Sequence, residues 1–235
     1  MSVSNVAVLA AMNIELKPLI RAFSLQRDGT DRPAIFRGDA NGTKLVATTM
    51  NMGTAAATKA TERILELGPV DHLICIGVAG GLGPSVKVRE LVVPEVVVDA
   101  ATETEYRPAP LPGFTARGKL WTSDDFETDP VTLSPLIDKG VIALDMETAA
   151  IAAVCERRGT PWSVFRAISD MAGDTDDAVL AMANPDGSPN KGAVVRYFIR
   201  RPWHIFRLAR LGRDAQAATD IAADAAIAAC AAVEG

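Results

Sequence analysis

The sequence has 235 residues, of which 49% are hydrophobic and 23% are charged, and its formal net charge is −5. This composition is too apolar for a disordered chain, and the length allows one large core or two small ones. The acidic balance argues against a general nucleic-acid-binding protein, which needs a basic surface to meet phosphates.

The cysteines and the N-terminus restrict the cellular setting. Three cysteines, Cys75, Cys155 and Cys230, show no CxxC spacing, and the sequence contains only two histidines. We therefore expect a reducing compartment, with no metal site and no cofactor. The first residues lack the basic segment of a secretory signal, and no run of about 18 uncharged apolar residues occurs. These features predict a cytoplasmic protein.

Apolar runs alternate with helically spaced segments along much of the chain. Residues 3–12 predict a strand and residues 13–23 a helix. The Asn41-Gly42 pair predicts a hairpin between two strands, and an alanine-rich helix is expected from 54 to 67. Further strands are expected at 72–78, 91–99, 141–144 and 163–168, and a further helix at 146–158. This alternation predicts one α/β domain with a largely parallel or mixed sheet.

Two stretches depart from this alternation. Residues 100–140 contain five prolines and little periodicity, which predicts loops over a site or an interface. From Ala193 onward the chain predicts helix, broken near Pro202 and resuming to Val233. We therefore expect a single domain over 1–235 with a basic helical extension at about 191–213.

The basic extension carries seven lysine and arginine side chains and no acidic one. One interpretation places its arginines on solvent-exposed helix faces, where they pair with acidic loops. The other interpretation is a peripheral membrane contact, because Trp203, Phe206 and other apolar residues interleave with the arginines as in a membrane-surface helix.

Polar residues follow four of the expected strands, where ligands bind in α/β sheets. These positions are Glu15, Gly80-Gly81, Asp145 to Glu147 and Ser169-Asp170. Each has a plain structural explanation: a carboxylate at a helix N-terminus, a positive-φ turn, or an N-cap. The glycine run does not match the dinucleotide-binding pattern GxGxxG, because Val86 stands where the third glycine should be. Convergence of these groups at one sheet edge nevertheless favours a binding site.

Five strings occur in the same order as in a known family: AAMNIEL (10–16), NMGTAAATKATERILE (51–66), ICIGVAGGLGPSVKV (74–88), ALDMETAAIAAVC (143–155) and VFRAISDMAGD (164–174). They resemble the purine nucleoside phosphorylase and uridine phosphorylase superfamily, nearest its 5′-methylthioadenosine/S-adenosylhomocysteine nucleosidase branch. The tail at 184–211 is similar to the hopanoid-biosynthesis-associated phosphorylase subgroup. The resemblance implies a single three-layer α/β domain, with a central mixed sheet flanked by helices. It also implies a homo-oligomer that acts on a small-molecule purine nucleoside.

The resemblance also implies roles for individual residues. Asp170 matches the aspartate that protonates N7 of the leaving purine, Glu147 the glutamate that binds the ribose 2′ and 3′ hydroxyls, and Glu15 the glutamate that activates water. Phe126 falls where a phenylalanine stacks on the base. Further substrate contacts are expected from Met146, Ala79, Gly80 and Ser169. Breaking an N-glycosidic bond places positive charge on the sugar and negative charge on the base. Asp170 would therefore act in its protonated form and Glu15 in its ionised form.

The identity of the nucleophile is the main open question in the sequence. Phosphorylases of this superfamily hold phosphate with an Arg-x-Gly-Ser type string, whereas this chain has Cys75-Ile76-Gly77-Val78. Residues 10–13 also lack the glycine and arginine of the phosphate grip. Since a phosphate without charged partners is poorly compensated, hydrolysis is favoured. Arg166, interpreted here as a structural ion-pair partner, or an arginine of a neighbouring subunit would be needed for phosphorolysis.

The sequence thus predicts hydrolysis of a methylthioadenosine-like, adenosylhomocysteine-like or other 5′-substituted adenosine to free base and ribosyl product. The first alternative is a phosphate-dependent nucleoside phosphorylase that acts on adenosylhopane in hopanoid biosynthesis. A second alternative is a non-catalytic nucleoside-binding protein. The two carboxylates Asp170 and Glu15 count against it, because binding alone needs neither a proton donor nor a water activator.

Overall fold

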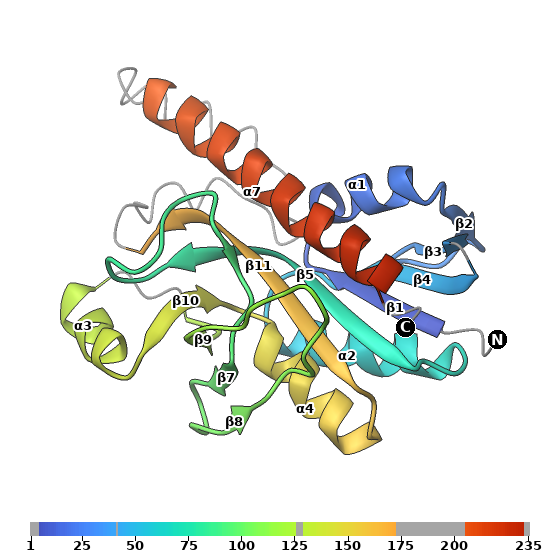
Figure 1. Ribbon diagram of the computed structural model, residues 1–235, viewed down its shortest axis with the longest axis horizontal. Helices are drawn as coiled ribbons and strands as arrows, with labels where there is room; N and C mark the ends of the chain where they lie inside the picture. The colour runs from blue at the N-terminus through green and yellow to red at the C-terminus, as the bar shows by residue number, and fades with distance from the viewer. Residues whose placement is uncertain (1–4, 41, 126–128, 173–204, 233–235) are drawn as a thin grey trace.

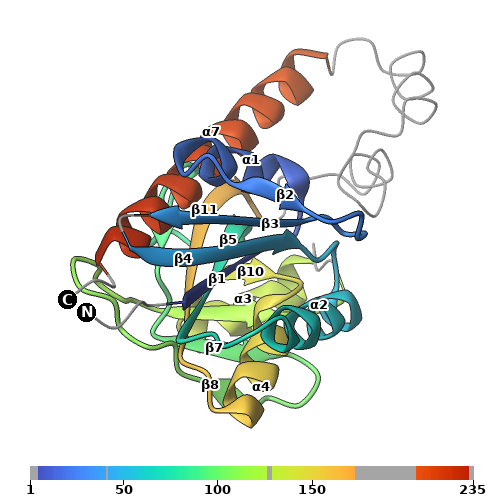
Figure 2. The ribbon, with the colours of Figure 1, turned by 90° about the vertical axis from the view of Figure 1, so that its right-hand side faces the viewer.

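A computed structural model of the chain describes residues 5–40, 42–125, 129–172 and 205–232. This part of the chain forms one mixed sheet of eleven strands with helices on both faces (Figures 1 and 2). The expected α/β fold with a central mixed sheet flanked by helices is therefore confirmed.

The elements have the following bounds. The strands are β1 (Asn5–Ala10), β2 (Gln26–Asp28), β3 (Ile35–Ala40), β4 (Thr43–Thr49), β5 (His72–Gly81), β6 (Leu91–Val92), β7 (Val96–Asp99), β8 (Glu105–Tyr106), β9 (Lys119–Thr122), β10 (Val141–Asp145) and β11 (Trp162–Met171). The helices are α1 (Asn13–Ala22), α2 (Thr54–Glu66), α3 (Pro130–Asp138), α4 (Thr148–Arg158) and α7 (Ile205–Ala232).

The strand order is β2-β3-β4-β1-β5-β10-β9-β7-β8, and β11 pairs with both β5 and β6. The central strands β4, β1, β5 and β11 run parallel to one another, whereas β10 meets the end of β5 in the antiparallel sense. Parallel strands covered on both faces read as continuous apolar runs, which explains the sequences of β1 and β5. The carboxyl ends of β1, β5 and β11 consequently share one edge of the sheet.

The two faces of the sheet carry separate hydrophobic clusters. Val6 and Val8 of β1 pack with Leu16 of α1 and with Ala226 of α7. On the opposite face, the alternate residues Ala7 and Leu9 pack with residues of α2 and α4. Successive side chains of a strand point to opposite faces, so one apolar run serves both layers. Figure 1 shows α7 lying across β5 and β11 beside α1, in agreement with the contacts between these elements.

The prediction of loops in place of core across 100–140 is wrong in part, because loops occupy most of this stretch, including 107–118, but regular elements interrupt them. This region contributes β8, β9 and α3, and β9 is an internal strand between β10 and β7 that buries Leu120 completely. A four-residue strand is too short to show a period. The proline count also misled the prediction, because Pro130 occupies the first turn of α3 after the N-cap Asp129, where proline is favourable.

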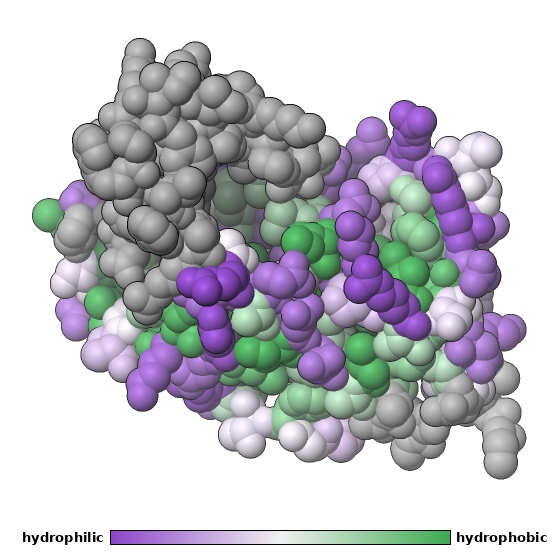
Figure 3. Space-filling model, turned by 90° about the horizontal axis from the view of Figure 1, so that it is seen from above, coloured by the Kyte–Doolittle hydropathy of each residue, from purple (hydrophilic) through white to green (hydrophobic). Residues whose placement is uncertain are grey.

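The basic extension predicted at about 191–213 lies only partly in the described structure. Residues 191–204 are outside the described residues, and 205–213 form the beginning of α7, whose helix confirms the predicted helical tail. Within the described ranges, no helix is both long enough and apolar enough to cross a membrane. Figure 3 shows the face of the molecule that lies at the top of Figure 1. On this face, apolar and hydrophilic residues are mixed. Membrane-surface binding by the extension stays a prediction.

Candidate functional site

The Gly80-Gly81 pair lies inside a strand and not in the predicted turn. Strand β5 continues through Gly81, and neither glycine has a positive φ angle. Antiparallel pairing with Ala143 and Leu144 of β10 extends the ladder at this point. A Cβ on Gly81 would lie 2.8 Å from Ile168 Cγ2, so glycine permits the close approach of β11. The positive-φ interpretation of this pair is therefore wrong.

A β-bulge in β11 positions two of the predicted site residues. Ile168 pairs with Ala79 and Asp170 pairs with Gly80, which leaves Ser169 as an extra residue. Bulges redirect the side chains beside them. Ser169 Oγ donates to Asp170 Oδ1 at 2.5 Å and lies 3.4 Å from the carbonyl oxygen of Ala79. Ser169 and Asp170 both line a cavity at this edge of the sheet.

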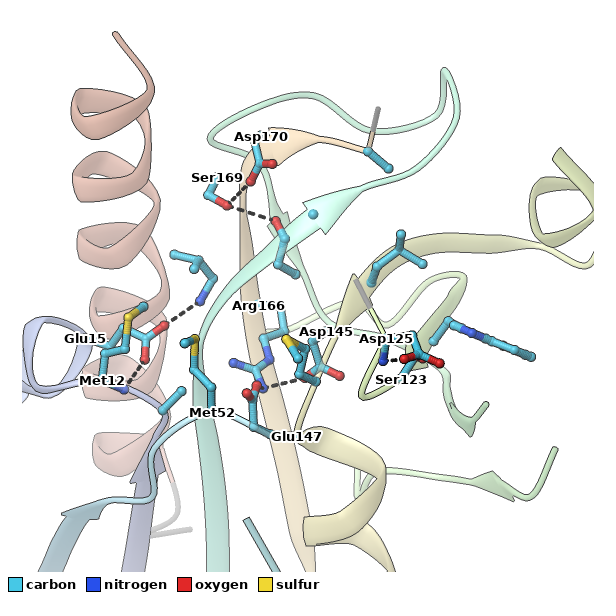
Figure 4. A pocket seen from close by; sticks show the side chains of 18 residues that line it. Met12, Glu15, Met52, Ser123, Asp125, Asp145, Glu147, Arg166, Ser169 and Asp170 are labelled. Carbon is cyan, nitrogen blue, oxygen red and sulfur yellow. Dashed lines mark hydrogen bonds and ion pairs between the residues drawn. The ribbon is translucent and has the colours of Figure 1, made fainter. Parts of the chain in front are cut away.

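Most of the predicted site residues line this single cavity (Figure 4). They are Glu15, Ala79, Gly80, Met146, Glu147, Ser169 and Asp170. In Figure 4, Asp170 and Ser169 lie at one end, Glu15 lies beside Met12, and Glu147 lies next to Arg166. Phe126, the predicted base-stacking residue, lies outside the described residues. The topology therefore brings together side chains from α1, β5, β11 and the start of α4.

Glu15 is buried in the first turn of α1, where it is only 2% exposed. Its Oε2 accepts a hydrogen bond from Met12 N at 2.8 Å, and its Oε1 accepts one from Val78 N at 3.0 Å. Burial raises the pKa of Glu15, although the Arg166 charge and the backbone donors oppose this effect. The raised pKa favours the protonated form of Glu15 in the site without substrate. The expectation from the sequence is the ionised form.

Glu147 precedes α4 and is held by the N-terminus of α2. Its Oε1 accepts a hydrogen bond from Gly53 N at 3.0 Å. Burial raises the pKa of Glu147 to about 7, while the Arg166 charge lowers it. A nearby substrate or a small change in pH would therefore change the charge of this carboxyl group.

Arg166 is fully buried at the centre of the site, and the prediction of an ion-pair role is confirmed. Its Nη2 lies 2.5 Å from Asp145 Oδ2 and 3.5 Å from Glu147 Oε2. Asp145 also accepts hydrogen bonds from Thr122 Oγ1 at 2.6 Å and from the backbone N of Thr148 at 3.2 Å. The latter contact satisfies the first backbone N–H of α4, so Asp145 is bound to this helix as well as to Arg166.

The other two nitrogens of Arg166 are poorly paired. Among the described residues, Nη1 has one long contact, 3.5 Å to the carbonyl oxygen of Ile76, and the buried Nε has no hydrogen-bond partner. A Cβ on Gly77 would lie 2.3 Å from Arg166 Nη1 and 2.7 Å from Glu15 Oε1, which places these two atoms no more than about 5 Å apart. No direct Arg166–Glu15 ion pair forms within the described structure. Gly77 thus leaves a narrow space between a donor and a carboxylate.

The lining of the cavity is rich in acidic residues. Its described lining includes five carboxyl groups and a single guanidinium group. The acidic residues are Glu15, Asp125, Asp145, Glu147 and Asp170, and the basic one is Arg166. The lining also contains apolar side chains, among them Met12, Met52 and Val78. No cluster of histidine, cysteine, aspartate and glutamate side chains suited to a metal ion occurs in the described ranges.

Sequence reasoning missed several lining residues. Arg166 was assigned to structure alone, although a charged side chain inside the apolar string VFRAI signals either burial or a site. Trp121, Ser123 and Asp125 come at or just after β9 and were missed because that strand was not predicted. Trp121 also packs with the apolar cluster beneath α3, as expected for a packing residue.

Comparison with known proteins gives a consistent result. The family model described as "Phosphorylase superfamily" matches residues 5–117 and 114–188. The 5′-methylthioadenosine/S-adenosylhomocysteine nucleosidase of Anoxybacillus flavithermus is 28% identical over 200 residues, covering 72% of this chain and 86% of the relative. The protein of the same name from Geobacillus kaustophilus is 30% identical over 168 residues, covering 59% and 72%.

Solved structures agree on the fold. Futalosine hydrolase of Helicobacter pylori strain 26695 superposes with a TM-score of 0.73 at 16% identity, covering 99% of each chain. The 5′-methylthioadenosine/S-adenosylhomocysteine nucleosidase of S. pneumoniae, solved with a transition-state inhibitor, gives 0.74 at 17% identity, covering 97% and 99%. Since the family model spans well over half of the sequence, this chain belongs to the phosphorylase superfamily.

Proposed function

We propose that this protein cleaves the N-glycosidic bond of a purine nucleoside with water as the nucleophile. The space between Arg166 Nη1 and Glu15 Oε1 carries the proposal. A span of at most about 5 Å fits one water molecule that makes a hydrogen bond of about 2.8 Å to each side. Such a water would accept from Arg166 and donate to Glu15. Glu15 would then take its proton as the oxygen attacks the sugar.

The charge of the site supports water over phosphate. Arg166 is the single described cation of the lining, and two carboxylates already contact it. A phosphate dianion in this position would face Glu15 and Glu147 with no uncommitted positive charge, which is unfavourable in a buried site. A neutral water has no such cost.

The proposed roles of the other carboxyl groups follow from their positions. Asp170, redirected by the bulge at Ser169, would donate a proton to the departing base. Glu147 would accept hydrogen bonds from the two ribose hydroxyls, and its ionised form would stabilise positive charge on the sugar. Phe126 and the cavity residues Met146, Ala79 and Gly80 are proposed to complete the substrate contacts.

The apolar wall favours a nucleoside with an apolar 5′ substituent. Met12 and Met52 lie next to Glu15 and Glu147 in the cavity (Figure 4). Methionine side chains adapt to apolar groups of varied shape. The names of the relatives, which are nucleosidases for methylthioadenosine and adenosylhomocysteine, support a 5′-thio-substituted adenosine as substrate.

A product assay tests the proposal directly. The protein is incubated with methylthioadenosine, adenosylhomocysteine, adenosine and inosine, with and without inorganic phosphate. We expect free base and free ribosyl product in phosphate-free buffer, with the 5′-thio substrates used fastest. Strict dependence on phosphate with ribose 1-phosphate as product would overturn hydrolysis.

Phosphorolysis is the second candidate, and the two poorly paired nitrogens of Arg166 are the observation that favours it. They could donate to phosphate if the neighbouring carboxyl groups were protonated. Adenosylhopane is tested in the same assay as a lipid-linked substrate. A non-catalytic binding protein would be stabilised by adenine yet release no product on long incubation.

A further inference from the structure

Asp145 is the residue whose contacts bear on the choice between water and phosphate. Its side chain is only 1% exposed, although the residue lines the cavity. Thr122 Oγ1, Thr148 N, Thr148 Oγ1 and Arg166 Nη2 all donate to its carboxylate. A buried carboxylate with this many donors is fixed in place.

This arrangement determines what Arg166 can offer to a ligand. Arg166 Nη2 donates to Asp145 Oδ2 and, at 2.9 Å, to Thr148 Oγ1. The carboxylate of Glu147 is a second, longer contact of the same nitrogen. The positive charge is therefore compensated inside the protein. The remaining donors, Nε and Nη1, can still bind a neutral acceptor.

From this geometry we infer that Asp145 is the positioning residue that selects the nucleophile. It neutralises and orients Arg166, so that the site holds a water molecule and excludes inorganic phosphate. The inference rests on the proposed hydrolytic function and extends it. Asp145 itself need not touch the substrate, because it acts through Arg166.

The test replaces the carboxylate by its neutral isostere. Asp145→Asn keeps the size of the side chain and leaves Arg166 with an incompletely compensated buried charge, which an oxyanion can compensate. The matched control is Asp125→Asn, which removes one negative charge from the same cavity. In the described structure Asp125 forms no ion pair or hydrogen bond with Arg166, and its backbone N donates to Ser123 Oγ at 3.1 Å.

The first readout is thermal unfolding with and without inorganic phosphate or sulfate, at constant ionic strength. We expect Asp145→Asn to melt at a lower temperature than wild type and to be restabilised by either oxyanion, because ligands that bind the folded state raise its stability. Wild type and Asp125→Asn should show no such response. An equal anion response in all three proteins would overturn the inference.

The second readout is the product formed from the nucleoside. Phosphate and sulfate should each inhibit hydrolysis by Asp145→Asn at least about tenfold more strongly than hydrolysis by wild type, a difference of about 1.4 kcal/mol. Only phosphate can divert the product to ribose 1-phosphate. If Asp145→Asn does not fold, Thr148→Val removes the hydroxyl group between Asp145 and Arg166 and should give a weaker response of the same kind. No response in either variant would overturn the inference.

The two proposals fail separately. The unfolding assay needs no turnover, so it tests the role of Asp145 even if the substrate is misassigned. A wild-type enzyme that works only with phosphate would reject the hydrolytic function. A wild-type enzyme that hydrolyses without phosphate, together with an anion-insensitive Asp145→Asn variant, would reject the role of Asp145 alone.

Discussion

The two ends of the β5–β11 strand pair differ in their polar groups. At the amino end these groups pair with one another and stabilise the fold, and at the carboxyl end they line the proposed binding site. At the amino end, His72 Nε2 lies 2.9 Å from Ser163 Oγ, which donates to the carbonyl oxygen of Ala109 at 2.7 Å. Burial lowers the pKa of His72, so its imidazole is neutral at pH 7. At the carboxyl end, Arg166 lies among carboxylates and keeps a buried nitrogen that has no partner in the described part of the chain.

This difference has a physical reason. Buried polar groups normally pair within the protein, and exceptions mark places where a ligand completes the pairing. The amino end is complete without a ligand, whereas the carboxyl end has donors and carboxylates in surplus. Changes at the two ends should therefore separate effects on stability from effects on turnover.

The largest expected effect is on turnover at the carboxyl end. Asp170→Asn removes the proposed proton donor and should lower kcat by about 10²–10⁴-fold, the usual contribution of general acid catalysis. Initial rates of base release measure it. Asp129→Asn, at the N-cap of α3, is the control and should retain activity. Full activity of Asp170→Asn would remove the acid role from this residue.

Next in size is the stability of the buried charge cluster. Arg166→Met leaves Asp145 and Glu147 without their cation and should lower the free energy of unfolding by about 3–5 kcal/mol, measured by urea denaturation. Arg157→Met, which breaks an exposed pair with Glu62, should cost about 1 kcal/mol or less. Equal losses would show that the cluster contributes no more than a surface pair.

The pH dependence of the same cluster should come from Glu147. Its pKa of about 7 in the folded protein exceeds the ordinary glutamate value of 4.5, so the folded state holds a proton that the unfolded chain releases between these pH values. This contribution to stability is present at low pH and is lost as the pH rises through about 7. Unfolding from pH 4 to 9 should show wild type losing stability relative to Glu147→Gln over this range. A constant difference between the two proteins would contradict the raised pKa.

The smallest expected effect is at the amino end. Ser163→Ala removes the hydroxyl group between His72 and Ala109 and should lower the free energy of unfolding by about 1–3 kcal/mol without changing kcat. Ser123→Ala, in the cavity wall, should show the opposite pattern, with a change in KM and little change in stability. A fall in kcat for Ser163→Ala would show that the two ends are coupled.

Local patterns in the sequence were sufficient for the long elements. The continuous apolar runs of β1 and β5 and the capped helix α4 are visible because they are long enough for their period to show. The short strand β9 was missed, and with it the wall that carries Ser123 and Asp125. The seven described residues predicted for the site lie together because parallel strands end at one edge. Their roles stay predictions.

The sequence by itself determined the α/β class and the family, because apolar periodicity and the five ordered strings depend only on local residue order. Only the tertiary structure decided what the glycines and Arg166 do. Gly81 admits β11, Gly77 leaves space between Arg166 and Glu15, and the bulge at Ser169 redirects Asp170. These effects depend on distances of a few ångströms between strands that are remote in sequence. No residue pattern along a single strand specifies such distances.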